Sequence, residues 1–136
     1  MAVSIDEPVM FRDTDATGIG HYLGMLRFLE RGEYALMEAI GVLNRSLLQE
    51  RYHFPRVHLS VNYRHPIRFG DRLRVRTWVQ RIGTTSYTLG MEVTNPAREQ
   101  LCFDAEITVV VVDPETMRPV PIPEPLRAAL AQHLAG

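Results

Sequence analysis

Two aspartates stand directly before a predicted helix. Asp13 and Asp15 lie in the segment Asp13-Thr14-Asp15-Ala16-Thr17-Gly18, which is rich in turn-forming residues, and helical periodicity begins at about Tyr22. A carboxylate can attack a carbonyl carbon or activate water, and the free N–H groups at a helix start can stabilise the oxyanion that forms. This one segment could therefore supply both requirements for hydrolysis at a carbonyl.

The same residues also have a purely structural interpretation. Asp and Thr are common helix N-caps and Asx-turn or ST-turn residues, so Asp13, Thr14 or Asp15 could do no more than order the chain before the helix. On spacing alone this interpretation is favoured, because such caps are common.

Other nucleophiles and bases have weaker patterns. His21 could activate water, but we favour a partly exposed polar residue at the helix start. His58 and Ser60 share a strand face, which is routine at alternating positions, and no third member of a triad is evident. Cys102 has no His at a readable spacing, so we expect a strand residue rather than a nucleophile. No Cys/His cluster has the spacing of a zinc site, and no metal is expected.

The basic residues are distributed unevenly. All 15 are Arg, and seven of them lie between residues 56 and 81, where Asp71 is the one acid. This segment could be a solvated strand face, a site for coenzyme phosphates, or a nucleic-acid surface, since Arg binds phosphate well. Nucleic acid would call for stacking aromatics on the Arg face, and Trp78 alone qualifies. With a formal net charge of −1, we expect no nucleic-acid partner.

One long helix should position the aspartate segment. Apolar residues recur at helical spacing over residues 22–40, and their wide stripe predicts a largely buried helix. Gly32 lies in its middle at a cost of up to ~1 kcal/mol relative to Ala, which close approach to a sheet would explain. Gly41 suits the C-terminal cap. A weaker helical turn is predicted at 44–50, and a short amphipathic helix at 124–134.

The remaining segments predict strands. A short strand is expected near 8–12, and period-two alternation predicts four more at 57–64, 72–80, 86–93 and 101–112. The connections at 69–71, 82–84 and 95–97 are short and turn-like, so neighbours in sequence should pair antiparallel. Such a sheet buries one helix most economically by curling around it. We therefore predict a single α+β domain over residues 1–136 with the hotdog fold, an antiparallel sheet of about five strands wrapped around one long central helix.

The segment from Val9 to Tyr22, continuing through residues 27–30, resembles the 4-hydroxybenzoyl-CoA thioesterase family of hotdog enzymes. The similarity is greatest to the branch with an Asp-x-Asp-x-x-Gly-Ile/Val motif before the helix. Segments 62–71, 81–86 and 113–121 resemble the family in the same order, so the resemblance covers nearly the whole chain. It implies an acyl-CoA thioesterase that releases free acid and coenzyme A and needs no cofactor.

The resemblance also implies roles within the motif. Asp15 would be the nucleophile or the general base, and the backbone N–H of Tyr22 would polarise the thioester carbonyl, although Tyr22 could also be a core anchor. Gly18 belongs to the motif, and Glu30 matches a carboxylate that faces the acyl pocket, or else is a solvated helix acid.

Contacts to the rest of the substrate are less specific. Arg64, Arg81, Thr84 and Thr85 are the residues we select for coenzyme A. Gly24 and Met25 replace the Asn and aromatic residue that the family often has, so no acyl group is assigned.

Two other functions remain open. The chain could be a thioesterase acting on an acyl carrier protein, or a non-catalytic acyl-CoA-binding module. A hotdog dehydratase is disfavoured because no matching pair of His and acid is present.

The sequence also allows predictions of the oligomeric state and the cellular location. Open sheet edges, and a second sheet face carrying Cys102, Val110 and Val112, predict a homo-oligomer, a dimer or tetramer with active sites at the subunit interface. The absence of a signal-like amino terminus and of a run of ~20 apolar residues predicts a cytoplasmic protein without a membrane span.

Overall fold

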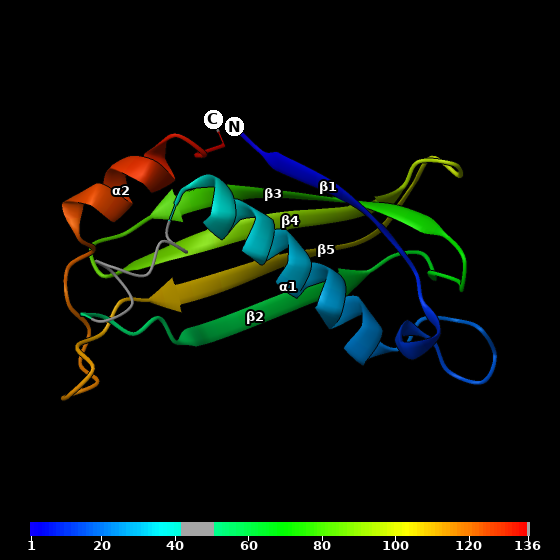
Figure 1. Cartoon of the computed structure of the whole chain (residues 1–136), viewed down its shortest axis with the longest axis horizontal. Helices are drawn as coiled ribbons and strands as arrows, with labels where there is room; N and C mark the ends of the chain where they lie inside the picture. The colour runs from blue at the N-terminus through cyan, green and yellow to red at the C-terminus, as the bar shows by residue number, and fades with distance from the viewer. Residues whose placement is uncertain (42–50, 136) are drawn as a thin grey trace.

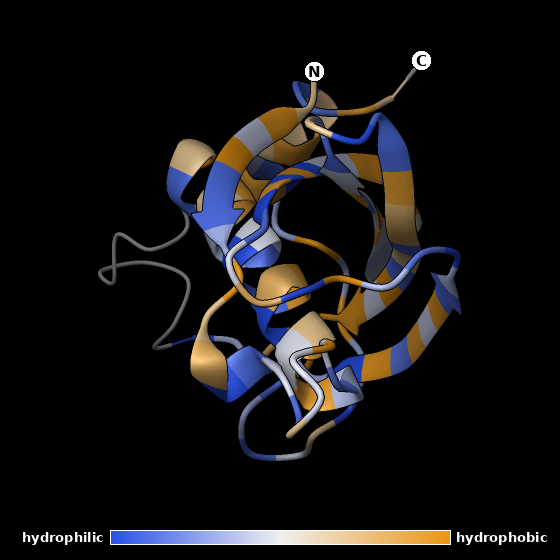
Figure 2. Cartoon of the chain, turned by 90° about the vertical axis from the view of Figure 1, so that its right-hand side faces the viewer, coloured by the Kyte–Doolittle hydropathy of each residue, from blue (hydrophilic) through white to orange (hydrophobic). Residues whose placement is uncertain are grey.

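A single curved sheet surrounds one long helix in the computed structural model, which describes residues 1–41 and 51–135. Figure 1 shows α1 lying across the sheet, and the end view of Figure 2 shows the sheet curving around it. The strands are β1 Val3–Pro8, β2 Arg56–Tyr63, β3 Arg72–Ile82, β4 Ser86–Asn95 and β5 Gln100–Val110, and the helices are η1 Phe11–Asp13 (a 3₁₀ turn), α1 Tyr22–Ala39 and α2 Glu124–Ala131.

The predicted hotdog fold is confirmed. The five strands are ordered β1-β3-β4-β5-β2, and each neighbouring pair is antiparallel. The long helix has nearly the predicted bounds, and Gly41 follows it with φ +79°, as suits a helix C-terminus. α2 begins where predicted but ends three residues early, and the turn predicted at 44–50 lies outside the described residues.

The first strand was predicted too late in the chain. It covers Val3–Pro8, where Ile5 pairs with Val75 of β3, whereas residues 11 and 12 of the predicted strand belong to η1. After Pro8 the chain leaves the sheet and forms η1, which packs against α1.

The pairing predicted for the second and third strands was also wrong. β2 pairs with β5, and β3 pairs with β1 and β4, so β2 and β3 lie on opposite sides of the sheet centre. The short turn-like segment 69–71 carried no information about this, because the chain between the two strands crosses the end of the sheet rather than forming a hairpin.

The core lies between α1 and the concave face of the sheet. Phe28, Leu29 and Leu36 of α1 are buried there. Gly32 is where the helix comes nearest: a Cβ at this position would lie 2.6 Å from both Thr77 Oγ1 and Val75 Cγ1. The close approach predicted for this glycine is confirmed.

Gly32→Ala is expected to destabilise the protein. The substitution improves helix propensity by up to ~1 kcal/mol, but overpacking of a filled core costs ~1–3 kcal/mol, so we expect a net loss of about 1–2 kcal/mol. Thermal unfolding measures this loss, with Ala39→Ser at an exposed position of the same helix as the control. A higher melting temperature for Gly32→Ala would show that the sheet yields at this point.

The three residues predicted on the second face of the sheet are largely covered by the chain itself. Cys102 and Val112 are buried, and Val110 is half-buried. Past β1, the edge of β3 is covered by the C-terminal segment, where the N–H of Val79 donates to the His133 carbonyl and that of Ala135 donates to the Val79 carbonyl, both at 2.9 Å.

The exposed apolar side chains of the sheet are instead on β2, at its other edge. Val57, Leu59 and Tyr63 are 59%, 47% and 54% exposed. Nothing in the described part of the chain pairs with the outer edge of this strand. Among the described helices, none has both the length and the hydrophobicity needed to cross a membrane.

Candidate active site

Asp15 stands at the base of a closed loop between η1 and α1. Its N–H donates to the carbonyl of Ile19 at 2.9 Å, and its own carbonyl accepts from the N–H of Gly18 at 3.0 Å. Gly18 has φ +81°, a conformation that side chains disfavour, so glycine is the natural residue there. The loop thus folds back on itself before the chain enters the helix.

The segment 67–69 anchors this loop. The N–H of Gly20 donates to the Ile67 carbonyl at 2.8 Å, and the N–H of Phe69 donates to the Gly18 carbonyl at 2.9 Å. The rings of Phe11 and Phe69 stack beside it, with centroids 4.2 Å apart. The aspartate loop is therefore held between η1 and the segment that leads into β3.

The Asp15 carboxylate is exposed to solvent and ordered by one neighbour. Its Oδ1 accepts hydrogen bonds from both the backbone N–H (2.7 Å) and the hydroxyl of Thr17. This is the Asx-turn that the structural interpretation predicted, and it also holds the carboxylate in place. The hydrogen bonds from Thr17 outweigh the small desolvation and lower the pKa of Asp15 below its usual value, so the group is a carboxylate at neutral pH.

The start of α1 presents unused donors. Tyr22 is the first residue of the helix, and no hydrogen bond among the described residues uses its N–H or that of Leu23. The tyrosine ring is 65% exposed, so it is not a core anchor. The geometry combines an ionised carboxylate in the preceding loop with free N–H groups at the helix start.

His21 is the N-cap of α1, which agrees with the interpretation of His21 as a polar residue at the helix start. Its Nδ1 accepts from the N–H of Gly24 at 3.2 Å, and its Nε2 lies 3.0 Å from the Arg12 carbonyl, to which it can only donate. Both nitrogens are thus occupied by the backbone. A role as the base that activates water does not fit this geometry.

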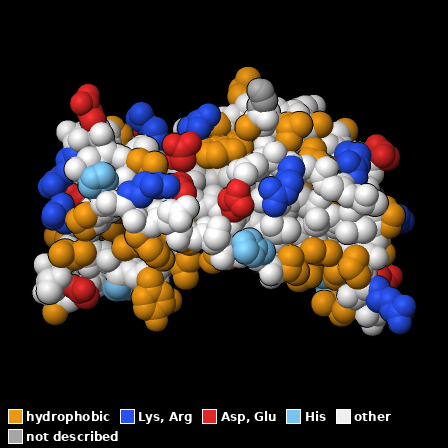
Figure 3. All heavy atoms as spheres, turned by 180° about the vertical axis from the view of Figure 1, so that it is seen from behind, with side chains coloured by type: hydrophobic (Ala, Val, Ile, Leu, Met, Phe, Trp, Pro, Cys, Tyr) orange, Lys and Arg blue, Asp and Glu red, His pale blue; other side chains and the backbone are white. Residues whose placement is uncertain are grey.

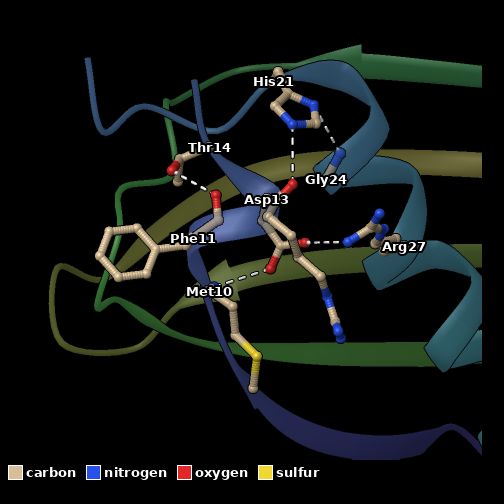
Figure 4. A network of polar contacts seen from close by, with 8 residues as sticks. Met10, Phe11, Asp13, Thr14, His21, Gly24 and Arg27 are labelled. Carbon is tan, nitrogen blue, oxygen red and sulfur yellow. Dashed lines mark hydrogen bonds and ion pairs between the residues drawn. The ribbon is translucent and has the colours of Figure 1, made fainter. Parts of the chain in front are cut away.

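Asp13 has a different environment from Asp15. It is buried (4% exposed), its Oδ2 accepts from the N–H of Met10 at 2.9 Å, and its Oδ1 lies 3.7 Å from Arg27 Nη1. Figure 4 shows this carboxylate between the backbone of Met10 and the side chain of Arg27. The two aspartates of the motif therefore divide between a buried structural position and an exposed one.

Glu30 lies on the exposed side of α1, two turns from Tyr22. It borders two hollows: a mixed one of about 650 Å³ shared with Arg27 and Arg31, and an apolar one of about 520 Å³ shared with Leu29 and Leu59. The apolar hollow opens at the β2 edge. Glu30 is therefore exposed to solvent and also borders a cavity, so both interpretations of this residue fit its position.

The residues selected for coenzyme A are not all together in one protomer. Arg64 follows β2, and its Nε is 2.6 Å from Asp104 Oδ2. Arg81, Thr84 and Thr85 lie at the far end of β3, an 11-residue strand that spans about 35 Å from the end next to the Asp15 loop. The far end of β3 and the loop before α1 lie at opposite ends of the sheet (Figure 1), so one chain alone does not bring these residues and Asp15 to the same ligand.

The basic segment is largely neutralised by acids from other elements. Four of its seven arginines form ion pairs, namely Arg56 with Glu33, Arg64 with Asp104, Arg74 with Asp6, and Arg76 with Glu92. Figure 3 shows the result, with Arg and acidic side chains interspersed on the outer face of the sheet. Arg76 also lies over the ring of Trp78, 4.9 Å from its centroid. Within β3, then, the alternating arginines form a solvated face on which Arg74 and Arg76 are ion-paired.

The remaining nucleophile candidates are not assembled into a site. His58 and Ser60 share a face of β2, and no hydrogen bond joins them in the described structure. Burial raises the pKa of the Cys102 thiol, which disfavours the thiolate. Cys102 is thus a buried strand residue, as predicted.

The known proteins that are similar to this chain include thioesterases and CoA thioester hydrolases. A family model described as the thioesterase-like superfamily matches residues 9–130. The acyl-CoA thioester hydrolase YbgC of Escherichia coli O157:H7 is 30% identical over 124 residues, which cover 91% of this chain and 92% of the relative. The 1,4-dihydroxy-2-naphthoyl-CoA hydrolase of Thermosynechococcus vestitus is 29% identical over 123 residues, which cover 90% and 84%.

A solved structure has the same fold. The 1,4-dihydroxy-2-naphthoyl-CoA thioesterase Slr0204 from Synechocystis superposes with a TM-score of 0.85, at 20% identity, over 96% of each chain.

Proposed function

The chain belongs to the thioesterase-like superfamily, and from that premise we propose that it hydrolyses acyl-CoA thioesters with Asp15 as nucleophile or general base. The observation that carries this proposal is the Asp15 carboxylate itself, ionised, exposed and held by Thr17 in the loop before the free N–H of Tyr22.

Both roles of Asp15 lead to the same products. As a base, it takes a proton from water while the water oxygen bonds to the thioester carbon, and the proton then goes to the departing sulfur. As a nucleophile, its oxygen bonds to that carbon, the C–S bond breaks, and water hydrolyses the acyl anhydride. In either case negative charge develops on the carbonyl oxygen in the tetrahedral intermediate, and the Tyr22 N–H stabilises this oxyanion.

The proposal is tested by measuring free thiol released from a panel of acyl-CoA esters. Steady turnover is expected with at least one ester. Turnover of carrier-bound esters alone would favour the carrier-protein alternative, and tight binding without thiol release would favour a non-catalytic acyl-CoA-binding module.

The acyl group stays open within this function. The relative from Escherichia coli is named for acyl-CoA thioesters in general, and the one from Thermosynechococcus for a dihydroxynaphthoyl ester. The apolar hollow beside Glu30, with Leu29 and Leu59 in its walls, supports a pocket for the acyl group with Glu30 at its rim.

A homo-oligomer completes the proposed site. Two β2 strands paired antiparallel about a two-fold axis would continue the sheet and cover Val57, Leu59 and Tyr63. The strands of the two protomers then run in opposite directions. The β3–β4 turn of one protomer, with Arg81, would lie at the same end as the Asp15 loop of its partner. A dimer, or a tetramer of two such dimers, would thereby unite coenzyme contacts that one chain separates.

The proposed coenzyme contacts can be tested by alanine substitution. Arg64→Ala and Arg81→Ala are each expected to raise KM a few-fold with little change in kcat, because phosphate contacts are shared by the ground and transition states. Arg74→Ala is the matched control, because Arg74 is ion-paired with an acid as Arg64 is but lies on the outer face of β3. An unchanged KM in both variants would reject both contacts.

A further inference from the structure

We propose that His21 is a positioning residue that clamps η1 to the first turn of α1 and so fixes the direction of the Tyr22 N–H relative to Asp15. The inference rests on the proposed function, in which that N–H faces the oxyanion. It assigns to His21 a role other than that of an acid or base.

The imidazole bridges two backbone segments. On one side Nε2–H donates to the carbonyl of Arg12 in η1 (3.0 Å), and on the other Nδ1 accepts the N–H of Gly24 in α1 (3.2 Å). Figure 4 shows the ring between the two elements, with one contact to each. This arrangement calls for the neutral ring with its proton on Nε2, because a doubly protonated ring has no acceptor.

Close packing reinforces the bridge. The backbone N–H of His21 donates to the Asp13 carbonyl at 3.0 Å, so the residue is tied to η1 through its main chain as well as its side chain. Gly24 lies directly against η1: a Cβ there would be 2.3 Å from the Asp13 carbonyl oxygen and 2.6 Å from the Asp13 Cα. Contacts of residues 21 and 24 therefore hold the first turn of the helix on both sides of Tyr22.

These contacts act on the proposed oxyanion donor through the peptide plane. The N–H of Tyr22 belongs to the rigid peptide unit that begins at the His21 carbonyl, so its direction follows the orientation of His21. The His21 carbonyl accepts from the N–H of Met25 at 3.1 Å, which fixes the other end of this unit. If the donor is displaced by ~1 Å from its position facing the oxyanion, the reaction rate can fall by up to ~10²-fold.

An ordinary N-cap would not make the same link. Asn, Asp and Ser are the commoner caps because their short side chains accept an N–H of the first turn. These side chains are too short to contact a second backbone segment at the same time, as the two nitrogens of the imidazole do. The combination of capping and bridging is what distinguishes His21 from a simple cap and is what an experiment can separate.

The kinetic test compares His21→Asn with the native enzyme. Asn keeps the cap but loses the bond to Arg12, so we expect an unchanged melting temperature and KM and a kcat reduced about tenfold, because a loosened donor acts in the transition state. The shape of the pH–rate profile should not change. The matched control is His133→Asn, whose ring contacts the Met1 carbonyl at 2.8 Å at the other end of the sheet and which should leave kcat unaltered.

Two kinetic outcomes would overturn the inference. A His21→Asn enzyme with native kcat would show that His21 is only a cap. Loss of one limb of the pH–rate profile, together with a fall in kcat as deep as that of an Asp15 variant, would show that it is an acid or base.

A spectroscopic readout is independent of catalysis. Nitrogen NMR of the native protein should find the His21 ring proton on Nε2 and an unprotonated Nδ1. A proton on Nδ1 would reject the clamp. If no thioester is hydrolysed but this tautomer is found, the proposed function fails while the bridging geometry stands.

Discussion

Asp15→Asn is expected to lower kcat by at least ~10²-fold, the lower end of the effect of losing a positioned base, while the melting temperature stays nearly unchanged. Asn can accept the same hydrogen bonds from Thr17 and so can keep the turn, but an amide cannot act as a carboxylate nucleophile or base. Thiol release from the best acyl-CoA ester measures kcat, and thermal unfolding measures stability.

Asp13→Asn is the matched control for this prediction. The buried side chain can still accept from Met10, but the charge facing Arg27 is lost. We therefore expect the opposite pattern, a lower melting temperature with a much smaller change in kcat. Near-normal turnover in Asp15→Asn would mean that the carboxylate of the reaction lies elsewhere.

The ionisation of Asp15 adds a pH dependence. Its pKa lies below the usual value because Thr17 stabilises the charged form, so the carboxylate stays ionised at pH values where an ordinary aspartate begins to be protonated. We expect kcat/KM to show no inflection from Asp15 between about pH 5 and 8. An inflection near pH 6 that disappears in Asp15→Asn would contradict the lowered pKa.

Val57→Arg is expected to convert an oligomer into an inactive or nearly inactive monomer. Val57 is on β2, 59% exposed, and would be covered in the proposed dimer, where an unpaired charge costs several kcal/mol. Light scattering should give at least twice the 15.5 kDa chain mass for the native protein and the chain mass for the variant. Turnover should fall on the order of 10²-fold, because the partner no longer completes the site.

Met117→Arg provides the comparison for this variant. Met117 is an apolar residue of similar exposure (54%) in the turn after β5, outside the β2 strand. Its substitution should leave mass and turnover unchanged. A native protein that is fully active as a 15.5 kDa monomer would contradict the proposed interface.

The long helix and the strands were predictable because their signals are local. A wide apolar stripe over residues 22–40 specifies a buried helix, and period-two alternation specifies strands. The close approach of Gly32 could also be inferred, since a costly glycine within a helix calls for a compensating contact. Pairing was not local in the same way: the partner of β2 is β5, forty or so residues later, and no turn signal between β2 and β3 distinguishes a hairpin from a crossing.

The aspartate segment was only partly readable. Asp-x-Thr is itself an Asx-turn signal, so the contact of Thr17 with Asp15 could have been anticipated from the sequence. The capping role of His21 could not, because His is not among the usual N-caps and its second partner, the Arg12 carbonyl, carries no side-chain signature.

The sequence by itself determined the long helix and the four strands that follow it, that this helix lies inside one curled sheet, and that a carboxylate precedes the helix. These follow from periodicity, turn chemistry and the order of the motif. Tertiary structure alone decided that Asp13 is buried while Asp15 is exposed, although the two residues are nearly adjacent. It also decided that four of seven clustered arginines are neutralised, since their acids are brought from β1, α1, β4 and β5. The physical reason is the same in both cases. Burial and ion pairing depend on which distant segments pack together, and a local segment of the sequence contains only one of the two residues in each contact.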